Sequence, residues 1–197
     1  MSVAKLVTPA NIMAMPEYGK KRAELRRELS ALRATRRVEV GPFVTFSFEC
    51  YRTIWHQIHE MLFIEKGGEE QIEGELSAYN PLIPNGHELV ATMMIEIEDP
   101  VRRARELARL GHIEDQIAFR VGGSEAKAAP EQDEERTTAD GKTSSVHFLH
   151  FPFTAAQIAA FKQANSEVVL TIGHTNYRHM AILPEPVRAA LAEDFAG

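Results

Sequence analysis

The sequence predicts an α+β fold, a single domain with an antiparallel-rich mixed sheet and several packed helices. Three observations lead to this prediction. Helical and strand-like patterns are mixed along the chain, without the regular alternation that builds a parallel sheet. Several strand-like segments follow one another directly, as antiparallel strands do. The chain has 197 residues, of which 44% are hydrophobic, enough for one substantial core, so we expect residues 1–197 to form one globular domain.

The first half of the chain combines helices with strands. Residues 16–36 are predicted to be a helix, because Leu25, Leu29 and Leu32 recur at i, i+4 and i+7. Apolar and polar residues alternate on both sides of Gly41-Pro42, which predicts two strands joined at a turn. The other predicted elements are helices at 50–66, 69–80 and 100–110 and a strand in the segment "HELVATMMIEIEDP".

The second half is richer in strands. We predict strands in the segments "HIEDQIAFRVGG", "SSVHFLHFPF", "SEVVLTIGH" and "YRHMAIL". Thr154 is a suitable N-cap for a helix over "TAAQIAAFKQAN", and a last helix covers "PEPVRAALAEDF". Residues 122–142 are polar and almost free of large apolar side chains, which predicts a mobile loop within the domain.

Charge argues against two classes of partner. With 22 Lys and Arg against 28 Asp and Glu, the net charge is -6, which opposes attachment to nucleic acid or to an anionic membrane. Arg22, Arg26 and Arg33 form a basic stripe on the first helix, but Glu24 and Glu28 interleave with it. We therefore interpret the stripe as a solvated face and expect neither a nucleic-acid nor a membrane partner.

Cysteine content and the absence of targeting signals indicate the compartment. The single cysteine, Cys50, excludes an intramolecular disulfide and any metal site built from several cysteines of one chain. The sequence shows neither a secretion signal nor an apolar run long enough to span a bilayer. A cytoplasmic protein is the expectation.

Searches for catalytic motifs exclude several enzyme classes. The sequence contains no P-loop, no G-x-G-x-x-G, no H-E-x-x-H and no G-x-S-x-G. It also lacks the Glu-x-x-His pairs of ferritin-like di-iron bundles. Nucleotide binding through these motifs, zincin proteolysis, α/β-hydrolase chemistry and di-iron chemistry are therefore not expected.

Six segments, in this order, carry a resemblance: "IMAMPEY", "VGPFVTFSFE", "IHEML", "GELSAYNPLIP", "LVATMMIEI" and "LPEPVRAALAEDF". Over nearly its whole length the chain resembles a bacterial family of proteins of unknown function and similar size. The resemblance implies a setting in redox or peroxide-stress metabolism, with rubrerythrin-like or iron–sulfur proteins as partners. It assigns no role to any residue.

The helix at 50–66 offers the densest titratable chemistry. His56 and Glu60 lie one helical turn apart and project from the side opposite the apolar stripe, with His59 on the flank. Such a pair can share a metal ion or a proton. The alternative, which the amphipathic pattern favours, is a solvated helix face. Phe63 and Ile64 are apolar on that same side, so another segment or a partner chain is expected to cover it.

Histidines on the predicted strands form a second group of candidates. His147 and His150 point to opposite faces of one strand, while His174 keeps the parity of Ile172 and so lies at an edge of the core. In most proteins strand-end histidines are hydrogen-bonded and inert, which is the competing interpretation. If they converged instead, a transition-metal or acid/base site would use His174, His147, His150 and His179, together with His56 and Glu60.

A third group could bind a ligand. Glu75, Tyr79 and Asn80 precede a proline-rich turn, where polar residues line pockets or cap helices, and Tyr177 lies next to the strand histidines. From these features we expect an accessory protein that binds a partner protein, a second copy of itself or a small ligand. The alternative is a metal-dependent or acid/base enzyme that uses the histidine cluster.

Overall fold

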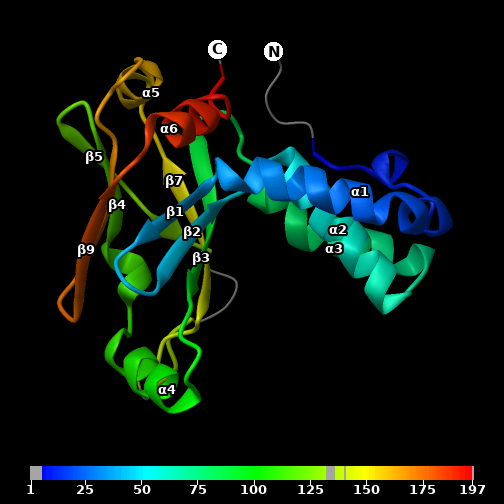
Figure 1. Ribbon diagram of the computed structural model, residues 1–197, viewed down its shortest axis with the longest axis horizontal. Helices are drawn as coiled ribbons and strands as arrows, with labels where there is room; N and C mark the ends of the chain where they lie inside the picture. Colours follow the sequence, from blue (N-terminus) through cyan, green and yellow to red (C-terminus); the bar gives the residue numbers. More distant parts are fainter. Residues whose placement is uncertain (1–5, 132–135, 140, 197) are drawn as a thin grey trace.

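The computed structural model describes residues 6–131, 136–139 and 141–196. In this part of the chain, six α-helices and two fully antiparallel sheets form one α+β domain, which confirms the predicted class. The strands make two sheets rather than one. We call the nine strands the sandwich, and the first three α-helices, which extend away from it, the helical unit (Figure 1).

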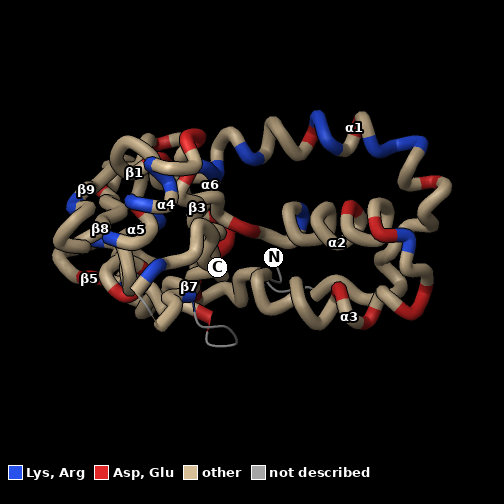
Figure 2. The backbone as a smooth tube through the Cα atoms, turned by 90° about the horizontal axis from the view of Figure 1, so that it is seen from below, with Lys and Arg blue, Asp and Glu red and all other residues tan. Residues whose placement is uncertain are grey.

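The helical unit comprises α1, α2 and α3, which lie side by side (Figure 2). Ile54, Ile58, Leu62 and Leu76 form the centre of its apolar core, with Val7 from the preceding segment. Short 3-10 turns, η1 and η2, flank the unit in sequence. The bounds are Pro9–Asn11 for η1, Met15–Ala34 for α1, Tyr51–Glu65 for α2, Glu69–Tyr79 for α3 and Asn80–Leu82 for η2.

The first sheet has the order β1-β2-β3-β7-β6. Register pairs Val38 with Phe46, Phe46 with Met93 and Met93 with His147, so alternate residues of four strands share the core face. Every strand expected from alternation in this sheet is present. The bounds are Arg37–Val40 for β1, Val44–Phe48 for β2, Glu88–Ile95 for β3, Val146–Pro152 for β7 and Ala129–Pro130 for β6.

The second sheet has the order β5-β4-β8-β9. Its strands are β4 (Ile117–Val121), β5 (Ser124–Lys127), β8 (Val169–His174) and β9 (Tyr177–Ile182). The 3-10 turn η3 (Ile113–Gln116) leads into β4.

Part of the segment predicted as a mobile loop is ordered into strands. β5 and β6 come from residues 122–142, so the loop prediction is wrong for residues 124–127 and 129–130. Gly122 and Gly123 adopt positive φ and turn the chain back, and Ala126 is then buried against the core. Residues 132–135 and 140 of the predicted loop lie outside the described part of the chain.

A shared apolar core joins the two sheets. Its centre is a set of phenylalanine rings in mutual contact: Phe48, Phe119, Phe151, Phe153, Phe161 and Phe195. Helices α5 (Ala155–Lys162) and α6 (Glu185–Ala192) close one end of the sandwich, and α4 (Pro100–Arg109) lies at the other (Figure 1). No helix in the described ranges is both long and apolar enough to cross a membrane.

The turn between β1 and β2 is fixed to β9. Gly41 has φ +76°, and a Cβ atom there would lie 2.5 Å from the hydroxyl of Tyr177. That hydroxyl donates to the carbonyl of Val40 at 2.8 Å and accepts from the amide of Phe43 at 3.2 Å. The phenol of Tyr177 thus serves as a structural tie across the open edges of the two sheets.

The outer face of the first sheet is only partly covered. Val90 and Phe148 pack against the core of the helical unit, so α2 and η2 cover one part of this face. Further along β3, Thr92 and Met94 face the space beside the helices, and a groove remains there.

Candidate functional site

The groove between the helical unit and the outer face of the first sheet, which we call the interface groove, has a volume of about 380 Å³. This size falls within the range of small-molecule sites, which favour junctions between packed units. Polar and apolar side chains are mixed in its lining: Arg33, Arg37, Ser47, Glu49, Ile54, Gln57, Tyr79, Leu82, Thr92, Met94 and Phe148.

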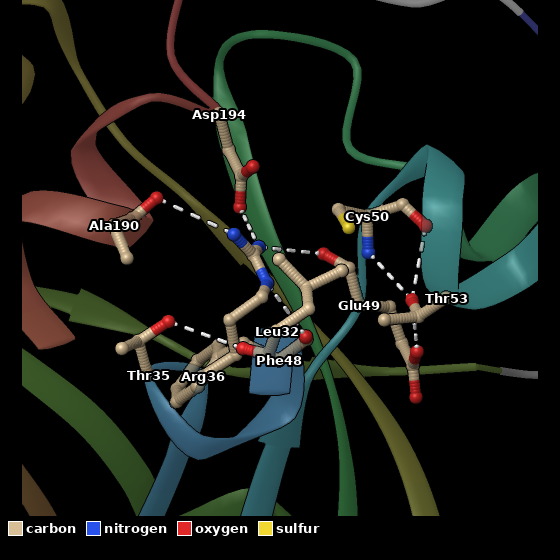
Figure 3. Close-up of polar contacts among 9 residues, drawn as sticks. All are labelled: Leu32, Thr35, Arg36, Phe48, Glu49, Cys50, Thr53, Ala190 and Asp194. Atoms are coloured by element: carbon tan, nitrogen blue, oxygen red, sulfur yellow. Dashed lines mark hydrogen bonds and ion pairs between the residues drawn. The ribbon is translucent and has the colours of Figure 1, made fainter. Parts of the chain in front are cut away.

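Glu49 is the acidic residue of the interface groove. It lies between the end of β2 and the start of α2, and its amide donates to the carbonyl of Val90 on β3 at 2.8 Å. One carboxylate oxygen accepts from Thr92 Oγ1 at 2.7 Å and the other from Thr53 Oγ1 at 2.6 Å (Figure 3 shows the second bond). Two hydroxyl donors therefore fix the orientation of the carboxylate and leave lone pairs free for a ligand.

Buried Arg36 fixes the backbone at Phe48 and Glu49 (Figure 3). Its guanidinium donates to the carbonyls of Phe48 at 3.1 Å, Glu49 at 3.0 Å and Ala190 at 3.3 Å, and forms an ion pair with Asp194. Burial raises the pKa of Asp194 to about 6, although Arg36 opposes the rise. The end of α1, the end of β2 and the C-terminal segment after α6 therefore meet at one guanidinium, which positions Glu49.

Two arginines provide the positive charge of the interface groove. Arg37 contacts Glu96 at 3.0 Å and Glu39 at 3.8 Å, so its guanidinium is held in place. The side chain of Arg33, at the end of α1, makes no hydrogen bond or ion pair with any described residue. The lining of one groove thus combines a fixed carboxylate with two cations, and the side chain of Arg33 has no polar partner among the described residues.

A second polar cluster lies inside the helical unit. The hydroxyl of Tyr18 donates to Glu60 Oε1 at 2.7 Å and lies 3.4 Å from His56 Nε2. The guanidinium of Arg22 donates two hydrogen bonds of 2.8 Å to the same carboxylate. Arg22 lowers the pKa of Glu60 to about 2, whereas burial raises that of Tyr18 and lowers that of His56.

The structure corrects the solvated-face interpretation of α2. His56 and His59 are buried, because α1 packs over this side of α2 and brings Tyr18 between them. As expected, another segment covers part of this face: α1 packs on Phe63, whereas Ile64 stays 61% exposed. His59 Nε2 accepts from the amide of Met13 at 2.9 Å, so Nδ1 carries the proton and donates to the carbonyl of Trp55 at 2.7 Å. With both ring nitrogens occupied, His59 is a structural residue.

His147 and His150 point to opposite faces of β7, as the sequence predicts. His150 faces outward, and its hydrogen bond to Glu88, 3.0 Å long, raises its pKa. His147 is fully buried and donates from Nε2 to the carbonyl of Ser144 at 3.0 Å. Its Nδ1 lies 3.7 Å from Glu114 Oε2, and neither of these two atoms has a hydrogen-bond partner among the described residues. Burial lowers the pKa of His147.

The remaining strand histidines lie in the second sheet. His174 is buried at the end of β8, and its Nδ1 accepts from the amide of Asn176 at 3.2 Å. His179, on β9, packs its ring against Tyr177 at 4.4 Å between centroids. His174 and His179 thus belong to a different sheet from His147 and His150. His56 and Glu60 lie on α2 in the helical unit and belong to neither sheet.

Metal binding stays a prediction. Among the described residues, no three or more His, Cys, Asp or Glu side chains are grouped so that they could hold a metal ion. The six predicted ligands occupy three regions: the helical unit holds His56 and Glu60, the first sheet holds His147 and His150, and the second sheet holds His174 and His179.

The ligand-binding candidates have different roles. Tyr79 lines the interface groove, where its hydroxyl accepts from Gln57 Nε2 at 3.5 Å. The amide of Asn80 instead pairs with both backbone groups of Val7, at 2.9 Å each, and ties down the segment before α1. Glu75 accepts from Gln71 at 2.8 Å on the surface of α3.

Sequence reasoning missed the central acid of the groove. The sequence does not single out Glu49 as a site residue, and it places Thr53 and Thr92 only within a predicted helix and a predicted strand. The available signal was local: a carboxylate directly after a buried strand and before a helix is placed at a junction of elements. The sequence places Arg33 in a solvated stripe of the first helix. It cannot show that Arg33 lines the same groove as Arg37 of β1.

Comparison with known proteins agrees with this fold. The model of the family described as "Protein of unknown function (DUF3501)" matches residues 6–195. The chain belongs to this family. A crystal structure of a novel protein of unknown function from Burkholderia pseudomallei K96243 is 36% identical, with a TM-score of 0.90, and the match covers 98% of this chain and 100% of that one. No curated protein matches the chain.

Proposed function

We propose that this DUF3501 protein is a binding protein for small zwitterions of amino-acid size, which it takes up in the interface groove. The observation that carries the proposal is that a fixed carboxylate, Glu49, and two arginines, Arg33 and Arg37, line one cavity of about 380 Å³. An amino group would bind the carboxylate, and an acid group would bind the guanidinium groups.

The apolar part of the lining suits the rest of such a molecule. Phe148, Met94 and Ile54 offer an aromatic ring, a thioether and an aliphatic side chain. Methionine adapts its shape to different partners, so a range of side chains would fit. Because the backbone of Glu49 is held by Arg36, the site is preorganised and loses little freedom on binding.

A matched series of ligands tests the proposal. L-phenylalanine carries both charges, N-acetyl-L-phenylalanine lacks the cation and L-phenylalaninamide lacks the acid group. In NMR titrations that follow the Met94 methyl and the Thr92 amide, the free amino acid is expected to bind about tenfold tighter than either blocked form, since each loses a charged hydrogen bond.

Variants locate the site. Arg33→Ala should weaken L-phenylalanine about tenfold, whereas Arg27→Ala, an exposed arginine of the same helix outside the groove, should not. Equal binding of all three ligands, or no shift of the groove signals at saturation, would reject the proposal. A cytoplasmic location, a partner protein or self-association, and a link to rubrerythrin-like or iron–sulfur proteins, stay predictions.

A further inference from the structure

A second cavity, the end pocket, lies at the end of the helical unit that is farthest from the sheets. Its volume is about 900 Å³, and it opens between the segment before α1, the last turn of α2 and the first turns of α3. The walls are mainly apolar, formed by Ile12, Met13, Met15, Leu62, Phe63 and Ile72. None of the residues of the interface groove lines it.

Two lining residues of the end pocket, Phe63 and Met13, are fixed by contacts with other residues of the helical unit. The ring of Phe63 packs against Tyr18 at 5.8 Å between centroids, and the guanidinium of Arg22 lies 5.0 Å from its centre. The amide of Met13 is bonded to buried His59. The cavity is therefore a preformed feature of the helical unit.

The mouth of the end pocket is acidic. Glu69 and Glu73 line it from α3, and Lys66 is the single cation among its lining residues. None of these three side chains forms an ion pair or hydrogen bond with a described residue. The dipole of α3 stabilises Glu69 in the first turn, but this effect fades within one turn and does not extend to Glu73. An unneutralised carboxylate beside an apolar cavity is suited to a cation.

We propose that the end pocket binds a long-chain aliphatic amine, with its chain among the apolar walls and its ammonium group between Glu69 and Glu73. The charge of the lining favours a cationic head group, because two carboxylates and one ammonium group line the pocket. The pocket volume is suited to a small molecule, since it lies in the upper part of the range of volumes of small-molecule sites. The exposed Glu70, next to Glu69, adds to the negative potential.

Dodecylamine, dodecanol and dodecanoate share one chain and differ only in the charge of the head group. In calorimetric titrations of the full chain at low salt and below micelle formation, dodecylamine should bind about five- to tenfold tighter than dodecanol, and dodecanoate weakest. Glu69→Gln combined with Glu73→Gln should bring the amine down to the affinity of the alcohol. Lys66→Gln should tighten amine binding.

Glu70→Gln is the matched control, because Glu70 lies on the same helix but does not line the pocket; it should change amine affinity less than the double variant. Ile72→Gln should weaken all three ligands, and circular dichroism would verify that each variant is folded. Tightest binding of dodecanoate, lost in Lys66→Gln, would overturn the proposal in favour of an anion site. Equal binding of all three, or binding of none, would also overturn it.

Discussion

In the helical unit, a phenol, a guanidinium, an imidazole and a carboxylate meet between α1 and α2, whereas the centre of the sandwich is filled by phenylalanine rings. The two regions therefore depend on different forces. The cluster of Tyr18, Arg22, His56 and Glu60 is directional and charged, so it sets how the helices align and responds to pH. The aromatic core stabilises by burial and shape, which pH does not change.

The comparison also bears on where cavities remain. The core of the sandwich is densely packed, and the pair of His147 and Glu114 is buried within the protein. The helical unit packs three helices around polar ties and leaves cavities at both of its ends, the interface groove and the end pocket. Close packing of side chains in a core leaves few voids larger than a water molecule.

The largest effect is expected in the sandwich. Phe119 is fully buried and contacts Phe48, Phe151 and Phe161. Phe119→Ala should lower the free energy of unfolding by about 3–5 kcal/mol, because it leaves a cavity. Urea denaturation at several pH values measures this. A loss that varied between pH 3 and pH 7 would contradict a core that is independent of charge.

A smaller, pH-dependent effect is expected in the helical unit. The folded pKa of Glu60 is about 2 against 4.5 in the unfolded chain, so its ionised form is stabilised by folding. The contribution, about 2–3 kcal/mol, is fully present above pH 4.5 and is lost as the pH falls through about 2. The difference in unfolding free energy between wild type and Glu60→Gln should therefore shrink over this window. A constant difference would show that the charge of Glu60 is unimportant.

The smallest effect concerns the phenol that joins the cluster. Tyr18→Phe removes one hydrogen bond to Glu60 but keeps the ring contacts with Trp55 and Phe63, so the expected loss is about 1 kcal/mol. Thermal unfolding followed by calorimetry measures it. The variant should also raise the pKa of Glu60, seen by NMR. An unchanged pKa would assign the whole shift to Arg22.

The sequence predicts the elements better than the sites. Alternation located β3 and β7 and the leucine repeat located α1, because each signal lies within one segment. It does not locate β5 and β6, because both are short and mostly polar or small: β5 pairs with β4 and buries only Ala126, and the two residues of β6 pair with β7. The sites depend on distances between elements: Glu49 meets Thr92, 43 positions away, and His56 meets Tyr18, 38 positions away. Amphipathic periodicity places His56 on a solvent-exposed face of α2. It cannot show that α1 covers that face, because periodicity describes one helix at a time.

The central claim, that the interface groove is a ligand site, is tested most directly by a crystal structure of the protein soaked with L-phenylalanine. The account predicts electron density in the groove, with the carboxylate toward Arg33 and Arg37 and the ammonium group toward Glu49. A groove without added density at a concentration that saturates the NMR titration, or a ligand found only in the end pocket, would contradict it.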